Sequence, residues 1–169
     1  EPGVVDAARC LAWIIQKPGV IDRTMREAIN DRMYGCDDCQ DVCPPSTRSG
    51  RSDGTVDSDA STAQAFVDPI AILAMSDAEI IANFGRWYIH DREARWVRRN
   101  ALVVLGNKAA RNDAGARTAI ARCIVDPDPF VRAHAVWAAA RIGHQDLVPS
   151  DDPDAMVLDE LRCLPPPRG

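Results

Sequence analysis

Four cysteines near the start of the chain have the spacing of ligands for an inorganic cluster. They are Cys10, Cys36, Cys39 and Cys43, and the last three form the pattern C-x2-C-x3-C-P. Many bacterial iron–sulfur proteins carry the longer run C-x2-C-x2-C-x3-C-P, whose last cysteine ligates the other cluster of a pair. Met33 occupies the position of the first cysteine of that run. We therefore predict iron–sulfur ligation, with Cys10 replacing the absent first cysteine.

Zinc binding and disulfide formation are the alternatives to iron–sulfur ligation. A zinc knuckle usually pairs C-x2-C with a second C-x2-C or with two histidines. Neither follows these cysteines, because His90, His134 and His144 stand far along the chain. Clustered cysteines without a secretory signal segment indicate metal binding rather than disulfides. Iron–sulfur ligation is favoured, and zinc stays open as the second possibility.

A count of the ligands shows that the set is incomplete. If Cys10, Cys36 and Cys39 hold one cluster and Cys43 serves another, each cluster still lacks cysteines. Cys123 lies in an apolar helical stretch and is expected to be a buried structural thiol, and Cys163 lies in the tail. We expect the remaining ligands to come from sequence upstream of Glu1.

Two short helices and a loop are expected to position these cysteines. Asp6 is a typical N-cap, and periodic apolar residues predict a helix over residues 7–16 that ends at Lys17-Pro18-Gly19. A second helix is expected over residues 23–30. The loop after it carries the last three cysteines.

The second half of the chain contains an internal repeat with an offset of 34 residues. Residues 96–106 and 130–140 are its two copies, with equivalent positions such as Val97 and Val131. The run Asp126-Pro127-Asp128-Pro129 before the second copy is a helix-start signal. The pattern resembles short HEAT repeats, which stack pairs of helices into a solenoid. Because two copies are few for a free-standing solenoid, we expect them to pack against the cysteine segment.

Composition divides the chain into four predicted segments. Residues 1–45 form the iron–sulfur segment, and residues 46–64 are a Ser-, Asp- and Gly-rich flexible linker or loop. Residues 65–149 form the HEAT-like domain, and residues 150–169 are an acidic, then proline-rich tail that is expected to fray. The predicted fold class is mainly α: a ferredoxin-like iron–sulfur segment followed by short HEAT-like α-helical repeats.

The net charge of −5 hides a strong asymmetry. Residues 86–122 contain nine basic and three acidic residues, a local charge of +6, whereas residues 36–68 carry a local charge of −5. A basic segment between acidic ones indicates an anionic partner. No run approaches the ~20 apolar residues of a membrane span. We expect a monomeric cytoplasmic protein without a membrane segment.

Five arginines of the basic segment are candidates for contacts with RNA phosphates. They are Arg86, Arg92, Arg95, Arg98 and Arg99. Helical spacing predicts that Arg92, Arg95 and Arg99 share one face. The alternative is a solvated face whose arginines pair with neighbouring acids. For Arg98, a structural role is a further alternative.

Aromatic residues divide into core and surface candidates. Trp13, Trp96 and Trp137 stand at helical positions typical of a core. Trp87 and Tyr88 stand beside Arg86 in a predicted loop and are candidates for stacking on bases. His134, between alanines of a predicted helix, is expected to pack rather than to bind a ligand.

Two parts of the sequence resemble the epoxyqueuosine reductases. The first is R-M-Y-G-C-D-D-C-Q-D-V-C-P at residues 32–44, with D-A-A-R-C at residues 6–10, which is similar to that family's second cysteine motif. The second is G-R-W-Y at residues 85–88 with R-W-V-R-R-N-A-L-V-V-L-G-N at residues 95–107, similar to its C-terminal HEAT-like domain. The resemblance covers nearly the whole chain except the linker and the tail.

The resemblance implies an oxidoreductase that acts on tRNA. The family catalyses the last step of queuosine biosynthesis, the reduction of epoxyqueuosine at the tRNA wobble position, with cobalamin and two 4Fe–4S clusters. By resemblance, Cys10, Cys36 and Cys39 bind the cluster nearer the cobalamin, and Cys43 completes the other. The backbone of Cys36, Asp37, Asp38 and Cys39 would lie against the cobalamin. The arginine candidates would contact the anticodon stem-loop.

The resemblance also implies parts that this sequence lacks. These are an N-terminal cobalamin-binding domain (in the same chain or a separate one), the family's acidic proton donor and its first cysteine motif. An external electron donor is implied as well. We assign no catalytic residue in this chain and expect no turnover by the chain alone. A ferredoxin-like electron carrier fused to a HEAT-type protein-docking module, and a zinc-stabilised scaffold, are the competing functions.

Overall fold

The structure is a computed structural model that describes residues 6–43 and 66–168. In those two ranges the elements are α-helices and short 3-10 helices, without a strand, which confirms the mainly α prediction. None of the described helices is both long and apolar enough to cross a membrane. The linker predicted over residues 46–64 lies outside the described residues.

The cysteine segment is built from short helices. They are η1 (Ala7–Arg9), α1 (Leu11–Gln16), α2 (Arg23–Ile29) and α3 (Asp38–Asp41). Asp6 caps η1 as predicted, because its Oδ1 accepts a hydrogen bond of 3.0 Å from the amide of Ala8. The single helix predicted over residues 7–16 is wrong, since Cys10 adopts an extended ψ of 122° and separates η1 from α1.

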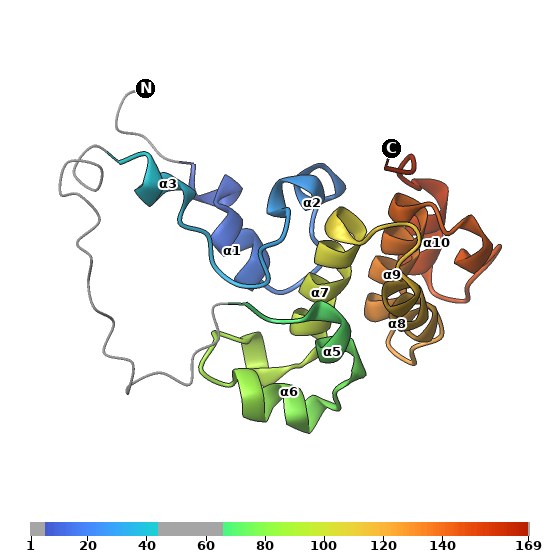
Figure 1. Cartoon of the computed structure of the whole chain (residues 1–169), viewed down its shortest axis with the longest axis horizontal. Coiled ribbons are helices and arrows are strands. Elements are labelled where there is room, and N and C mark those ends of the chain that lie inside the picture. The colour runs from blue at the N-terminus through green and yellow to red at the C-terminus, as the bar shows by residue number, and fades with distance from the viewer. Residues whose placement is uncertain (1–5, 44–65, 169) are drawn as a thin grey trace.

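The second half of the chain is a set of helices packed around two long central ones (Figure 1). The central helices are α7 (Arg95–Lys108) and α9 (Pro129–Ile142), which hold the two copies of the repeat and pack against each other. The surrounding elements are α5 (Pro69–Ala74), α6 (Asp77–Phe84), η2 (His90–Arg92), α8 (Ala114–Ile124), η3 (Gln145–Leu147) and α10 (Ala155–Arg162).

Local signals set the start of α9 as predicted. Asp128 is the N-cap, and its Oδ1 accepts a hydrogen bond of 3.0 Å from the amide of Phe130. Pro129 stands in the first turn, where its lack of an amide hydrogen costs nothing. The helix ends at Gly143, whose φ of 95° is the left-handed conformation that glycine adopts without strain.

The expectation that the repeats pack against the cysteine segment is confirmed. Helix α2 lies against α7, and buried residues of both halves belong to one apolar core. Ile15, Ile21 and Ile29 from the cysteine segment and Leu102 from α7 are at most 1% exposed. Full burial of one such side chain contributes roughly 1.5–3 kcal/mol to the contact between the cysteine segment and the repeats.

Close approach of α7 and α9 depends on Gly106. A methyl group added there would overlap the ring of Trp137. We expect Gly106→Ala to destabilise the protein by about 1–3 kcal/mol through overpacking, although alanine favours a helix. Urea unfolding measures the change. Gly115→Ala in α8 is the control, because its added methyl group would meet the side-chain ends of Asp113 and Ile70 at 3.3 Å rather than overlap an aromatic ring. A Gly106→Ala protein as stable as this control would contradict the packing.

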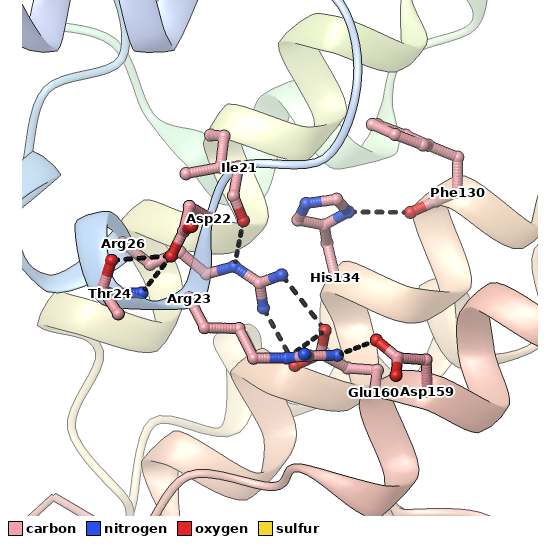
Figure 2. A network of polar contacts seen from close by, with 9 residues as sticks. All are labelled: Ile21, Asp22, Arg23, Thr24, Arg26, Phe130, His134, Asp159 and Glu160. Carbon is pink, nitrogen blue, oxygen red and sulfur yellow. Dashed lines mark hydrogen bonds and ion pairs between the residues drawn. The ribbon is translucent and has the colours of Figure 1, made fainter. Parts of the chain in front are cut away.

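The tail predicted to fray is folded, so that prediction is wrong. Helix α10 packs on α9 with Val157 fully buried. Figure 2 shows Glu160 of α10 facing Arg26 of α2, with oxygen–nitrogen distances of 3.0 and 3.1 Å, while Arg26 Nε donates to the carbonyl of Ile21. Asp159 pairs with Arg23 beside them at 2.6 Å. The C-terminal helix is therefore attached to the cysteine segment.

The tryptophan predictions are confirmed in part. Trp137 is 2% exposed and lies in the core, and Trp96 is half-buried with its ring edge-on to Phe130. Trp13 is 53% exposed, so its predicted core position is wrong. Its helix α1 has only six residues and buries the other side, through Ile14 and Ile15.

His134 packs in the core as predicted. Its side chain is fully buried, and Nδ1 lies 2.9 Å from the carbonyl oxygen of Phe130 (Figure 2). Burial, with the nearby Arg26 charge, lowers the pKa of His134 to about 3, so the ring is neutral at pH 7.

Candidate iron–sulfur and RNA-binding sites

The four candidate ligands lie at one end of the molecule. Cys10 precedes α1, Cys36 and Cys39 flank the start of α3, and Cys43 follows α3. Figure 1 shows α1 and α3 at the same end of the long axis, opposite α10. All four thiols are free, and none is buried. These cysteines are accessible thiols of the kind that iron–sulfur clusters require.

The described residues do not assemble a complete metal site. Within residues 6–43 and 66–168, no group of three or more His, Cys, Asp or Glu side chains is placed to hold a metal ion. The structure therefore does not bring Cys10, Cys36 and Cys39 together at ligand distance. By type, oxidation state and exposure the thiols fit a 4Fe–4S cluster, and their grouping stays a prediction.

The loop that enters α3 exposes its backbone. Gly35 has a φ of 77°, and a Cβ there would meet no atom within 4 Å. The amides of Cys36, Asp37, Asp38 and Cys39 donate no hydrogen bond to any described residue. Amides without a partner among the described residues are usual in the first turn of a helix, and here they leave the predicted contact of this backbone with cobalamin open.

One of the acidic residues beside the ligands is already paired. Asp38 lies 2.5 Å from Arg32, and this carboxylate raises the pKa of the Arg32 guanidinium. Asp37 accepts a hydrogen bond of 3.0 Å from Gln40. The carboxylates of Asp37 and Asp41 stay exposed and keep the loop negative, which would favour a low cluster potential.

Arg99 is a buried structural residue, so its predicted contact with RNA is wrong. Its side chain is fully buried and donates to the carbonyls of Lys17, Gly19 and Ile15 at 2.8, 2.7 and 2.5 Å. Burial lowers the pKa of Arg99 to about 10, which still leaves the guanidinium charged at pH 7. The guanidinium neutralises the partial negative charge at the end of α1.

The other arginines do not share one helical face as predicted. Arg92 lies in η2, before α7 begins at Arg95. Arg98 pairs with Asp77 and donates to the carbonyl of Met75, in agreement with the structural alternative for this residue. Arg95 lies 3.2 Å from the carboxylate of Asp128.

These arginines line an open groove of about 710 Å³ in which acids balance them. The lining includes Arg92, Arg95 and Arg98 together with Asp77, Glu93, Asp126 and Asp128. Arg86 and Arg92 are exposed and form no ion pair with a described residue. Arg86 and Arg92 are therefore the candidates whose charge is available to RNA.

The two loop aromatics have different surroundings. Trp87 stacks on Tyr34 with ring centroids 4.9 Å apart and an angle of 5°, and Phe84 lies 4.6 Å from its ring. The Tyr34 hydroxyl also accepts a hydrogen bond of 2.8 Å from the amide of Tyr88. Trp87 thus joins the two halves of the protein, and Tyr88, 59% exposed, is the aromatic candidate that stays open.

The two remaining cysteines are placed as the sequence suggested. Cys123 is 4% exposed in α8, and burial raises the pKa of its thiol to about 11. Cys163 follows α10 and is exposed.

Sequence reasoning missed Tyr34, Asn100 and Glu160, which join the cysteine segment to the helices. Each forms hydrogen bonds to residues more than 50 positions away along the chain. The one available signal was Asn100, a polar side chain just before the apolar run Ala-Leu-Val-Val-Leu of a predicted core helix.

Two family models match the chain. A 4Fe–4S double cluster binding domain matches residues 1–46, and HEAT repeats match residues 86–156. The predicted order of an iron–sulfur segment followed by HEAT-like repeats is thereby confirmed.

Curated relatives match most of this chain. The epoxyqueuosine reductase of Bacillus subtilis is 32% identical over 145 residues, which cover 85% of this chain and 36% of that protein. That of Alicycliphilus denitrificans is 36% identical over 154 residues, with 83% and 40% covered. An uncharacterized protein of Geobacillus stearothermophilus is 30% identical, with 88% and 67% covered. The chain spans less than half the length of the epoxyqueuosine reductases that it matches.

Solved structures share the fold. The epoxyqueuosine reductase of Streptococcus thermophilus has a TM-score of 0.63 at 25% identity, with 99% of this chain and 41% of that chain covered. An epoxyqueuosine reductase solved with an epoxyqueuosine-modified tRNA-Tyr stem loop has a TM-score of 0.69 at 24% identity, with 95% and 44% covered.

Proposed function

Because the chain belongs to the epoxyqueuosine reductase family and matches the C-terminal part of its members, we propose that it forms the iron–sulfur and RNA-facing part of such an enzyme. The enzyme would reduce epoxyqueuosine to queuosine at the tRNA wobble position, with cobalamin and two 4Fe–4S clusters. The observation that carries the proposal is the set of four free, accessible cysteines in a segment that matches a double-cluster domain.

The cysteines of this chain would hold parts of two clusters. Cys10, Cys36 and Cys39 would bind one cluster, with a fourth ligand from the part of family members that this chain does not match, and Cys43 would bind the other. Bound clusters supply single electrons, and bound cobalamin supplies reactivity toward carbon. The open loop from Cys36 to Cys39 would present its amides to the cobalamin.

Other parts of the reaction would lie outside these 169 residues. The cobalamin-binding domain and the acid that protonates the opened epoxide belong to the unmatched part, on the same chain or a separate one. An external donor would supply the electrons. We expect a cytoplasmic protein, in keeping with a tRNA-modifying role.

The RNA-facing surface would be led by Arg86 and Arg92, with Tyr88 available for stacking on a base. Their exposure and lack of a carboxylate partner among the described residues support this choice. Arg95 and Arg98 would contribute only if their present carboxylate partners exchange for phosphates. Binding by such a surface is mainly electrostatic and weakens as salt rises.

A salt titration with Arg86→Gln tests this surface. We expect the variant to bind an anticodon stem-loop more weakly and to reduce the slope of log affinity against log salt by about 0.7–0.9, the value for one lost phosphate contact. Fluorescence anisotropy at several salt concentrations measures both. Arg122→Gln is the control, because Arg122 is exposed at the end of α8, outside the candidate surface.

The same titration separates the two leading functions. An electron carrier with a protein-docking module would leave the stem-loop unbound even at low salt. That result would contradict the RNA-facing role.

A further inference from the structure

Asn100 contacts both segments that carry the candidate ligands of one cluster. It lies in α7 and is 6% exposed, so its carboxamide needs partners inside the protein. Its Nδ2 donates one hydrogen bond to the carbonyl of Ile15 and another to the carbonyl of Met33, each of 3.2 Å. Ile15 stands five residues after Cys10, and Met33 stands three residues before Cys36.

Arg99 fixes the orientation of this carboxamide. Arg99 Nε donates to Asn100 Oδ1 at 3.0 Å, which makes that side of the amide the acceptor. The NH2 group then faces the two carbonyls, and a flipped amide would place its oxygen against them. Arg99 also donates to the Ile15 carbonyl at 2.5 Å, so both side chains hold the end of α1.

A direct hydrogen bond between the two cysteine-bearing segments is absent from the described structure. Among the described residues, the hydrogen-bonded link between these two segments is the NH2 group of Asn100. The repeat mate of Asn100 is His134, whose Nδ1 instead lies near the carbonyl of Phe130 in its own helix. The bridge therefore belongs to the first repeat alone.

We propose that Asn100 is a positioning residue that sets the spacing between Cys10 and the Cys36–Cys39 loop, an inference that rests on the proposed assignment of these cysteines to one cluster. Because one side chain of α7 donates hydrogen bonds to both short segments, the distance between the segments depends on their positions relative to α7. The HEAT-like half of the protein would thus define the geometry of ligands that lie in the other half.

Pulsed EPR on the metal-free 169-residue chain measures this spacing directly. Nitroxide labels are placed on Cys10 and Cys39, which are both exposed, with Cys36, Cys43 and Cys163 changed to serine. Asn100→Leu removes both donors, and Asn100→Asp removes them at constant size. We expect the width of the Cys10–Cys39 distance distribution to increase roughly twofold in both variants, because the segments lose their common tether.

Asn107→Leu is the matched control. Asn107 lies two turns further along α7, and its Nδ2 donates at 2.7 Å to the carbonyl of Arg26, in α2, and at 3.1 Å to that of Asn30, the residue after α2. This variant loses the same kind of contact but leaves the hydrogen bonds to Ile15 and Met33 in place, and we expect its distribution to match the parent's. Circular dichroism and urea unfolding of every variant report whether the fold persists.

Three results would overturn the proposal: unchanged distributions in the Asn100 variants, an equal broadening in Asn107→Leu, or loss of cooperative unfolding in Asn100→Asp. The last would assign Asn100 to the stability of the fold. Because the measurement needs no metal, absence of iron from the protein that carries this chain with the rest of the family architecture would count against the proposed function and leave this test unaffected.

Discussion

Replacement of Glu160 by alanine is expected to destabilise the protein by about 3–5 kcal/mol, because it leaves the buried charge of Arg26 without a partner. Arg26 is fully buried, and Glu160 is 2% exposed. The pair is bidentate, and the Arg26 guanidinium also lies 5.3 Å from the centre of the Trp137 ring. Since a domain is stable by only about 5–15 kcal/mol, this loss is large.

Urea unfolding with two comparison variants isolates the cause. Asp159→Ala breaks the neighbouring exposed pair with Arg23, and we expect it to cost less than about 1 kcal/mol. The double variant Arg26→Met with Glu160→Leu removes both charges and is expected to recover most of the loss. A Glu160→Ala protein within about 1 kcal/mol of the parent would contradict the burial of this pair.

Replacement of Cys36 or Cys39 by serine is expected to remove one cluster from the protein that carries this chain together with the rest of the family architecture. About half of the bound iron should be lost, since the last cysteine of such a run serves a different cluster. Cys43→Ser should instead remove the other cluster, so the EPR signal that remains should differ from that of the Cys36 and Cys39 variants. Iron and sulfide analysis with EPR of the reduced protein measures these changes.

Cys163→Ser is the control for the cysteine variants. Cys163 is exposed like Cys39 but follows α10, outside the cysteine pattern. We expect unchanged iron in this variant. Equal iron in Cys36→Ser and Cys163→Ser would exclude Cys36 as a ligand.

Local chemistry explains what the sequence could predict. Asp6 and Asp128 cap their elements because a carboxylate and the amide two residues on are close in any helix start. The 34-residue repeat predicted α7 and α9, since small residues at matching positions allow two helices to pack closely. The cysteine spacing likewise identified the iron–sulfur segment, because the pattern is contained in a short stretch of sequence.

Contacts between residues far apart along the chain explain what the sequence could not predict. The tail folds because Glu160 meets Arg26, 134 positions away. Arg99 is buried because the end of α1 and the turn after it, 80 to 84 positions earlier, present three carbonyls to its guanidinium. Neither partner is marked by local composition, and an arginine in a basic run gives no sign that it is internal. The break at Cys10 was missed because apolar periodicity runs on across it.

The central claim is that this chain supplies iron–sulfur ligands. Metal analysis of the anaerobically purified protein that carries this chain with the rest of the family architecture tests it most directly. We predict iron and acid-labile sulfide in equal amounts, with visible absorption that bleaches on addition of dithionite. Zinc without sulfide, and a spectrum without visible absorption, would contradict the claim and favour the zinc-stabilised scaffold.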